Sequence, residues 1–472
     1  MRSILYNIFI IYLITLFCNV NADDNIDANW MSYLTNNNTL LNQLNIPGTH
    51  DSGTYDIGKL MNNDIADKVF KLLTFTWITT SQIAEFSKTQ KLDITEQLEH
   101  GIRYLDIRMM INDKNSTEIY ISHEDVPCVN LKKGHYTLKL TDVLDECINF
   151  LGKHKLETII IHLKTDSNPH DASNFDIGQK IASYTVLNTN MVPNSNNELY
   201  KDYFYNNDTI PTLGASRGKI VFVTRSVYSY NITKANGKDE PMNLGISIDV
   251  DSTGGCRNYP GDGIDCYPRI NGNYRFQDAY NLDGPDKWEL VKNVLTDNVD
   301  SRYAYYVNNT KNYETASYNN IISTKFNNNN NKEVLTFNFM NMARMDIENW
   351  YKDLFDSGIE ESADYVNSRL TKFIIDEKKL HNEWVVLDYP SPDVIRSIYQ
   401  SNDYNVSEFN KNKAEAKGWL SSVWTDAKYY ISKSLLNMWP FGKKDENNMN
   451  NVKVCLQRKL IIDEQGNQQD LV

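Results

Sequence analysis

The 472-residue sequence lacks several signatures that define common functional classes. It contains no Cys-x-x-Cys pair and no His-rich spacing, which argues against a zinc site. No Gly-x-Gly-x-x-Gly follows the first apolar run, so a dinucleotide-binding fold is not indicated. A basic excess is also missing, because the formal net charge is −13. Nucleic-acid binding is therefore not expected, since a phosphate backbone requires a basic face.

Residues 1–22 are expected to form a cleavable secretory signal peptide. They carry Arg2, then an apolar run, then small residues at Val20 and Ala22, before two aspartates. The alternative is an uncleaved membrane anchor, but the run is short for a spanning helix and contains an asparagine. We therefore expect a secreted, extracellular protein.

An oxidising compartment changes how the cysteines are interpreted. Cys256 and Cys266 flank a Gly/Pro-rich turn and are predicted to close a short disulfide loop. The pairing of Cys128, Cys147 and Cys455 stays open. A glycosylated surface is indicated by sequons at Asn37, Asn115, Asn207, Asn231, Asn308 and Asn405.

Short apolar, β-branched runs alternate with helical or polar stretches along the chain. The runs are 44–50, 101–111, 118–124, 157–166, 219–226, 243–250, 334–341 and 383–390, with helices expected at 143–154 and 286–297. Continuous apolar strands alternating with helices are typical of a parallel sheet covered by helices. About eight such runs favour a closed β/α barrel over an open doubly wound sheet.

Three segments interrupt or follow this pattern. Residues 251–280, rich in Gly, Asp and Tyr, are expected to be a long functional loop, and the Asn-rich stretch near 326–332 a disordered insertion. In the C-terminal extension, residues 403–472, apolar residues recur at helical steps over 413–444 and predict an amphipathic helix. That helix either docks on the barrel or lies in a membrane interface, where its tryptophans would suit the headgroup boundary.

Titratable residues stand at the C-terminal ends of the apolar runs. They are His50, Asp51, Asp106, Arg108, His123, Lys164, Arg225 and Asp388. Singly, each has a structural explanation, such as a hydrogen-bonded histidine or a salt bridge. The active site of a β/α barrel is built at that face from several strands, so their convergence predicts a site.

This residue set fits acid–base catalysis on a phosphodiester. Two histidines can serve as general base and general acid, one on each side of the phosphorus. A carboxylate behind each imidazole fixes its tautomer, and an arginine supplies a bidentate fork for phosphate oxygens. The inferred reaction is phosphoryl transfer with a guanidinium where other enzymes place a metal.

Four segments together resemble the phosphatidylinositol-specific phospholipase C X-domain family, in its secreted, bacterial-type and metal-independent form. They are IPGTHDSGTY (46–55), EQLEHGIRYLDIR (96–108), ISHE (121–124) and VVLDY (385–389). The likeness runs from about residue 28 to 402. It implies a distorted β/α (TIM-like) barrel that cleaves phosphatidylinositol to diacylglycerol and inositol 1,2-cyclic phosphate without a cofactor.

The resemblance also implies catalytic roles. His50 would be the general base with Asp388 behind it, and His123 the general acid assisted by Asp51. Arg108 would hold the phosphate. Asp106, on the same strand, would orient that arginine. Calcium-dependent relatives carry an acidic residue at the position of Arg108, so a metal-free site is expected.

Substrate recognition is implied for four further residues. Lys164 and Arg225 would hydrogen-bond inositol hydroxyls, Asp278 would bind the ligand, and Tyr280 would stack on the sugar ring. The expected partner is a membrane phospholipid, reached by transient contact of a monomer with the membrane surface.

Three alternatives stay open at this point. The same chemistry would serve on glycosylphosphatidylinositol anchors or another phosphodiester, with only the pocket rim changed. A non-catalytic lipid- or glycan-binding barrel is disfavoured by the intact pair His50 and His123. A metal-dependent glycerophosphodiesterase is disfavoured by Arg108 at the centre.

Overall fold

The structure is a computed structural model that describes residues 26–57, 87–111, 118–248, 256–259, 263–266, 274–296, 335–342 and 359–402, except 125, 131–133, 135, 170, 194, 196, 281, 283, 378–379 and 381. The chain divides into two compact units, Met1–Asn405 and Val406–Val472, and all described residues belong to the first. The predicted signal peptide, the Asn-rich insertion and the helix at 413–444 lie outside the described residues.

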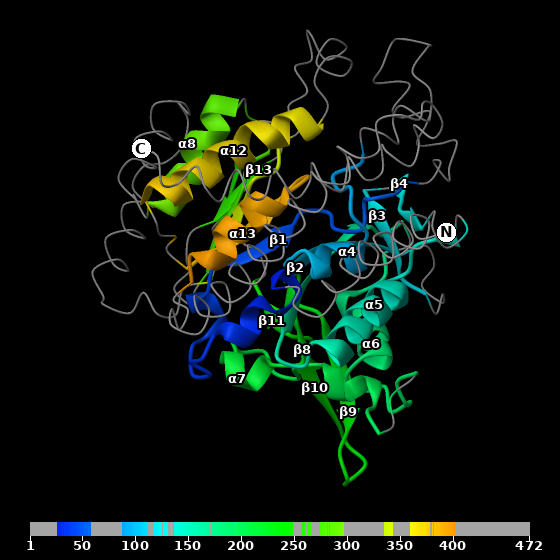
Figure 1. The fold of residues 1–472 in the computed structure, drawn as a ribbon. Coiled ribbons are helices and arrows are strands. Elements are labelled where there is room, and N and C mark those ends of the chain that lie inside the picture. Colours follow the sequence, from blue (N-terminus) through cyan, green and yellow to red (C-terminus); the bar gives the residue numbers. More distant parts are fainter. Residues whose placement is uncertain are drawn as a thin grey trace, which may run out of the picture. The chain divides into compact units, whose positions relative to one another are not determined.

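Eight parallel strands form the main body of a curled sheet (Figure 1). Their order is β11 (Ile246–Ser247), β8 (Lys219–Thr224), β7 (Thr158–Ser167), β2 (Tyr104–Met110), β1 (Ile46–Thr49), β16 (Trp384–Leu387), β15 (Leu335–Phe339) and β14 (Tyr274–Asp278). Within the described residues no ladder joins β11 to β14, so the barrel is not closed by hydrogen bonds on that side. The prediction of a distorted β/α barrel is confirmed.

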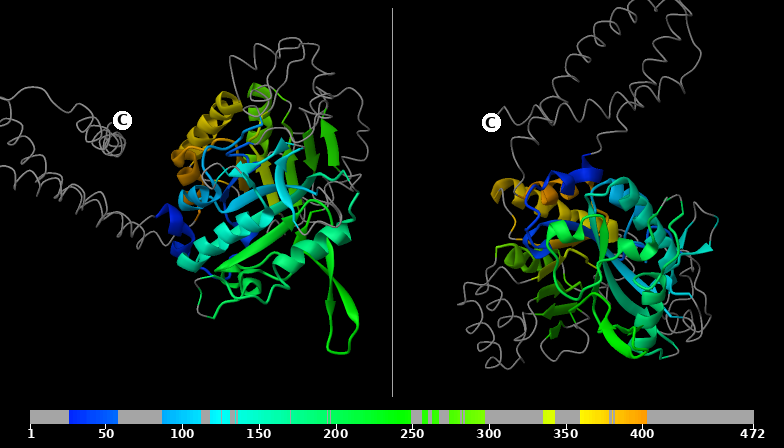
Figure 2. Two further views of the ribbon diagram at one scale, coloured as in Figure 1. Left: turned by 90° about the vertical axis from the view of Figure 1, so that its right-hand side faces the viewer. Right: turned by 90° about the horizontal axis from the view of Figure 1, so that it is seen from below.

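Antiparallel strands extend this sheet and form two separate hairpins. β13 (Gly263–Cys266) and β12 (Cys256–Tyr259) continue beyond β14, while β3 (Tyr120–His123) pairs with β2 and with β4 (Val126–Pro127). The hairpins are β5 (Val129–Asn130) with β6 (Tyr136–Thr137), and β9 (Ser229–Thr233) with β10 (Asp239–Asn243). The β9–β10 hairpin projects away from the barrel sheet (Figure 2).

Helices occupy the connections between the strands. They are η2 (Asp27–Tyr33), η3 (Leu41–Gln43), α4 (Ile94–Glu99), α5 (Leu140–Lys153), α6 (Asn174–Tyr184), η4 (Tyr200–Tyr203), α7 (Leu213–Ser216), α8 (Gly284–Leu295), α12 (Ile359–Glu377) and α13 (Pro392–Gln400). Side-chain oxygens of Asp93, Ser173 and Ser391 accept a backbone N–H at the starts of α4, α6 and α13. α12 packs against α8 and α13, and α13 also lies against β1. None of the described helices is both long and apolar enough to span a bilayer.

Two sequence expectations need correction. The run at 118–124 is not a barrel strand, because β3 runs antiparallel to β2 as part of a hairpin. Residues 251–280 are not simply a loop, because they contain β12, β13 and the barrel strand β14. The sequence therefore predicted the right number of barrel strands, eight, but it included β3 wrongly and omitted β14.

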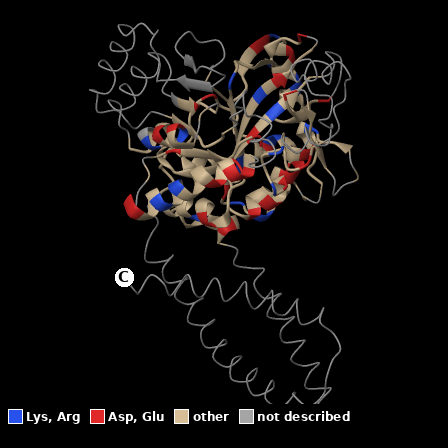
Figure 3. Cartoon of the chain, turned by 90° about the horizontal axis from the view of Figure 1, so that it is seen from above, with Lys and Arg blue, Asp and Glu red and all other residues tan. Residues whose placement is uncertain are grey.

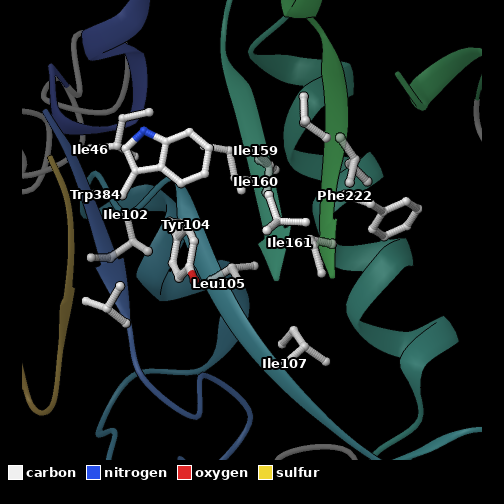
Figure 4. Close-up of a cluster of buried hydrophobic side chains, with 14 of the residues drawn as sticks. Ile46, Ile102, Tyr104, Leu105, Ile107, Ile159, Ile160, Ile161, Phe222 and Trp384 are labelled. Carbon is white, nitrogen blue, oxygen red and sulfur yellow. The ribbon is translucent and has the colours of Figure 1, made fainter. Parts of the chain in front are cut away.

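Trp384 and Tyr104 lie among aliphatic side chains in the interior where β1, β2 and β16 meet (Figure 4). Trp384 is fully buried, and its indole N–H donates to the carbonyl of Leu41 at 3.1 Å. Its ring centroid lies 5.8 Å from that of Tyr104 on β2. Gly48 makes this packing possible, since a Cβ there would lie 2.6 Å from Cδ1 of Tyr104. The Pro-Gly-Thr segment thus lets the first strand pass close to the second, just before His50.

Candidate active site

The backbone turns sharply at the ends of three strands that carry candidate site residues. Asp51 itself has a φ of 43°, Glu124 after His123 has 51°, and Tyr389 after Asp388 has 42°. Non-glycine residues with positive φ are uncommon, and they cluster at functional sites where surrounding structure holds them in place. Each turn stops a strand and leaves a titratable side chain at its end.

His50 follows β1 and is held from behind by β16. Its Nδ1 lies 2.9 Å from Oδ1 of Asp388, and its backbone N–H donates to the carbonyl of Leu387. Its Nε2 faces Nδ2 of Asn341 at 3.3 Å. Burial acts to lower the pKa of His50, but the carboxylates of Asp51 and Asp388 outweigh it and raise the pKa to about 9.

Arg108 on β2 occupies the centre of the site and is almost fully buried. Its Nε and Nη2 donate to Asp106, with the shortest contact at 2.7 Å from Nη2 to Oδ2. Its Nε also lies 3.0 Å from Oδ1 of Asp51, and its Nη1 lies 3.5 Å from Oδ1 of Asp166. Burial acts to raise the pKa of Asp106, but the guanidinium holds it well below its usual range. The guanidinium is thus fixed among three carboxylates.

His123 reaches the site from the β3–β4 hairpin and is the more accessible histidine, with its side chain 29% exposed against 11% for His50. Its Nδ1 donates to the carbonyl of Ser87 at 2.9 Å, and its Nε2 lies 3.4 Å from Oδ2 of Asp51. Both ring nitrogens face oxygen acceptors, so the imidazolium form is the one that satisfies both. A protonated imidazole is the form that a general acid requires.

The carboxylate of Asp51 lies between the two histidines. Its Oδ1 is 3.6 Å from Nε2 of His50, and its Oδ2 is 3.4 Å from Nε2 of His123. That Oδ1 is buried and has no hydrogen-bond donor within the described part of the chain, although Arg108 neutralises its charge. The two imidazoles therefore converge on one carboxylate beside one guanidinium.

Arg108 and His123 lie within a segment that matches a known family, whereas His50 and Asp51 precede that segment and Asp388 follows it. Residues 61–226 match the family described as phosphatidylinositol-specific phospholipase C, X domain. This segment of the chain is similar to that X domain.

Relatives of this X-domain family align over different shares of the chain. A 1-phosphatidylinositol phosphodiesterase of Listeria monocytogenes is 33% identical over 203 residues, which are 42% of this chain and 48% of the relative. The chain thus spans about half the length of that relative. A 1-phosphatidylinositol phosphodiesterase of Staphylococcus aureus is 22% identical over 424 residues, covering 85% of this chain and 98% of the relative.

Solved structures of the family share the fold. A mutant of the phosphatidylinositol-specific phospholipase C from Staphylococcus aureus superposes with a TM-score of 0.52 at 22% identity, covering 80% of this chain and 97% of the other. A second variant of the same Staphylococcus aureus enzyme gives a TM-score of 0.51 at 22% identity, with 80% and 98% covered.

The residues expected to recognise the substrate have partners of their own. Lys164 on β7 contacts Oδ1 of Asp166 at 2.8 Å and is partly exposed. Arg225 is buried, donates to Oδ2 of Asp278 at 2.8 Å, and stacks over the rings of Phe276 and Phe339. This ion pair joins the ends of β8 and β14, the two barrel strands near the side that no ladder closes. Tyr280, just beyond β14, is half-buried.

Several site residues were missed at the sequence level. Asp166 lies two residues after Lys164, so strand alternation places it on the same face and could have found it. Asn341 follows β15 at the same kind of strand end as the other candidates, and that position was the available signal. His162 is fully buried and shares a hydrogen bond with the Tyr104 hydroxyl through Nδ1. Burial lowers the pKa of His162 to about 3, which keeps it neutral, and nothing in the sequence marked it.

One trio of side chains has the spacing of a metal site. Donor atoms of His50, Asp51 and Asp106 lie within 4.8 Å of one another. The guanidinium of Arg108 contacts both of these carboxylates at 3.0 Å or less, so a cation already occupies the place where a metal would stand. The donor set therefore fits an arginine-centred site better than a metal centre.

On the outside of the molecule, acidic and basic residues are interspersed over the helices (Figure 3).

Proposed function

We propose that this chain is a phosphatidylinositol phosphodiesterase of the phospholipase C type. The single observation that carries this proposal is the convergence of His50 and His123 on Asp51 beside Arg108. Binding alone requires neither an acid nor a base, whereas cleavage of a phosphodiester uses both. The relatives named 1-phosphatidylinositol phosphodiesterase support the same substrate class.

In the proposed reaction, the inositol 2-hydroxyl attacks the phosphorus within the same molecule. Nε2 of His50 takes the hydroxyl proton as the new P–O bond forms, and Asp388 stabilises the resulting imidazolium. His123 gives a proton to the glycerol oxygen as its bond to phosphorus breaks, which releases diacylglycerol and inositol 1,2-cyclic phosphate. No water is consumed in this step.

Arg108 is proposed to bind the non-bridging phosphate oxygens and to stabilise the charge that grows on them in the transition state. Asp106 supports this role, because its carboxylate accepts from Nε and Nη2 of the guanidinium and so fixes its plane. Lys164, Arg225 and Asp278 are proposed to bind inositol hydroxyls, and Tyr280 to pack on the ring. These assignments rest on their position around the same end of the barrel.

The deciding experiment measures release of water-soluble cyclic inositol phosphate from phosphatidylinositol vesicles, with and without EDTA. Phosphatidylcholine vesicles and a glycosylphosphatidylinositol-anchored protein are run in parallel, with His50→Ala as the inactive control. Chelator-resistant release from phosphatidylinositol supports the proposal. Cleavage of the anchored protein alone would move the substrate to glycosylphosphatidylinositol, and vesicle binding without any cleavage would refute an enzymatic role.

We further propose that the protein is secreted and disulfide-bonded. The support is the signal-like pattern of residues 1–22 and the register of β12 with β13, in which Cys256 is the direct cross-strand partner of Cys266. The described cysteines Cys128 and Cys147 are buried free thiols. Sequencing the N-terminus of the mature protein should give Asp23, and mass spectrometry of the unreduced protein should find Cys256 joined to Cys266. The same spectra report whether the sequons carry glycans, and an unprocessed N-terminus would refute secretion by this route.

A further inference from the structure

A buried lysine lies behind the candidate general base. Lys287 on α8 is fully buried. Its Nζ donates to the carbonyl of Ala279 at 2.7 Å, to Oε1 of Gln277 at 3.1 Å and to Oδ1 of Asn341 at 3.4 Å. Lysine is seldom buried, and this one also interacts electrostatically with the carboxylate of Asp278.

Asn341 connects this lysine to His50. An ammonium can only donate and an ionised carboxylate can only accept. Lys287 therefore requires the amide oxygen on its side, and Asp278, whose Oδ1 lies 3.0 Å from Nδ2, requires the amide nitrogen on the other. With its orientation fixed in this way, Asn341 presents an N–H donor to Nε2 of His50 at 3.3 Å.

That donor distinguishes the two histidines of the site. Nε2 of His123 faces the Asp51 carboxylate, an acceptor, which suits a protonated ring. Nε2 of His50 faces the Asn341 donor at 3.3 Å, and Asp51 is farther away at 3.6 Å and already neutralised by Arg108. A donor at Nε2 and a carboxylate at Nδ1 are satisfied together only by the neutral ring with its proton on Nδ1. This is the form that a general base requires.

The charged groups around His50 act in opposite directions. Asp51 in the turn after β1 and Asp388 after β16 favour the imidazolium, and Asp278 at the end of β14 adds to them. Arg108 on β2 favours the neutral ring. His123 lies on the far side of the Asp51 carboxylate from His50. Lys287 is a further cation on this side, and it acts on His50 through the amide of Asn341. A hydrogen bond donated to the neutral form lowers a histidine pKa and so offsets the carboxylates.

We propose that Lys287 and Asn341 are positioning residues that fix the tautomer of the neutral His50 ring: when the ring loses a proton it keeps the one on Nδ1, and the Nε2 lone pair is directed into the active site. The proposal rests on the proposed function for its catalytic consequence, but not for the tautomer itself. When substrate binds, the inositol hydroxyl takes up the lone pair that Asn341 faces in the free protein.

Two variants at Asn341 test this assignment. Asn341→Asp keeps the size and removes the donor, and Asn341→Leu removes all hydrogen bonding. In Asn341→Leu, nuclear magnetic resonance titration of the His50 ring nitrogens should show its pKa raised by about one unit, the equivalent of one ordinary hydrogen bond. In Asn341→Asp the rise should be larger, because this variant also places a carboxylate beside the ring. Turnover of phosphatidylinositol by Asn341→Leu, as kcat/KM, should fall about tenfold at neutral pH and recover as the pH rises through the new pKa.

Lys287→Met tests the role of the lysine, because it frees the amide to rotate. We expect a shift in the same direction as in the Asn341 variants, and a Nε2 signal no longer confined to one tautomer. The matched control is Lys292→Met on the same helix, where the side chain is exposed and the pKa of His50 should not move.

The outcomes separate the two proposals. A folded Asn341→Leu protein that loses activity equally at every pH, with an unchanged His50 pKa, would overturn the positioning role and leave a structural one. If the wild-type protein releases no cyclic phosphate, the proposed function fails, and the ring-nitrogen titration still decides the tautomer.

Discussion

The ion pair between His50 and Asp388 gives the sharpest quantitative prediction. Oδ1 of Asp388 lies 2.9 Å from Nδ1 of His50, and the two side chains are only 2% and 11% exposed, so solvent screens them weakly. At an effective dielectric constant of about 20, unit charges about 4 Å apart interact by about 4 kcal/mol. This corresponds to about 3 pKa units at about 1.4 kcal/mol per unit, as an upper bound. Asp388→Asn removes that charge, so the pKa of His50 should fall from about 9 to between about 6 and about 8.

The kinetic consequence follows from the sign of this shift. Below its pKa His50 carries a proton and cannot act as a base, so kcat/KM of the wild-type protein should rise with pH up to about 9. In Asp388→Asn the rise should occur at lower pH, and the plateau should be lower because a weaker base removes the proton more slowly. The assay uses an inositol phosphodiester with an aryl leaving group. Such a group departs without a general acid, so the rise of kcat/KM with pH then reports the ionisation of the base alone.

The control for Asp388→Asn is Asp393→Asn, which removes an equal charge at an exposed position on α13. In Asp393→Asn, kcat/KM should rise with pH over the same range as in the wild-type protein. A rise at unchanged or higher pH in Asp388→Asn would refute the argument, because the group limiting turnover would then not be a histidine paired with Asp388.

Three further results are expected. His123→Ala should lower turnover of phosphatidylinositol by about 10²–10⁴-fold but have a much smaller effect on turnover of the aryl substrate, whereas His50→Ala should impair turnover of both. Equal losses on the two substrates in His123→Ala would contradict its role as the general acid. Arg108→Lys should lower kcat/KM at least tenfold in EDTA-treated protein, because an ammonium lacks the bidentate fork, and restoration by calcium would contradict an arginine-centred site. Gly48→Ala should lower the free energy of unfolding by about 1–3 kcal/mol in urea titrations, because the new Cβ would lie 2.6 Å from Cδ1 of Tyr104. Unchanged stability would show that β1 and β2 can move apart at this point.

Much of the candidate site could be predicted because its residues stand near the ends of apolar runs. His50 and Asp388 directly follow buried strands, Arg108 lies in the C-terminal half of β2, and parallel strands end at the same edge of a barrel. Strand direction could not be predicted in the same way. A short apolar run such as β3 has the same composition in a hairpin as in a barrel strand, and only its pairing with β2 decides the direction.

The residues that were missed depend on tertiary contacts. β14 was absorbed into the expected loop because its polar residues, including Gln277 and Asp278, follow a Gly-rich stretch. Lys287 in a helical pattern is normally a solvent-exposed residue, and it becomes buried only because α8 lies against β14 and β15. The partner that gives it a role, Asn341, is 54 residues away in the sequence.

The unequal exposure of the two histidines has a consequence for selectivity. His50 is enclosed by the core strands β1 and β16, on the side proposed to hold the inositol ring. His123 is carried by a hairpin at the margin of the sheet and is more open, on the side where the leaving alcohol would depart. Discrimination should therefore be strict for the stereochemistry of the ring hydroxyls and permissive for the alcohol, so that acyl chains of different length or saturation are released from the same headgroup with similar efficiency.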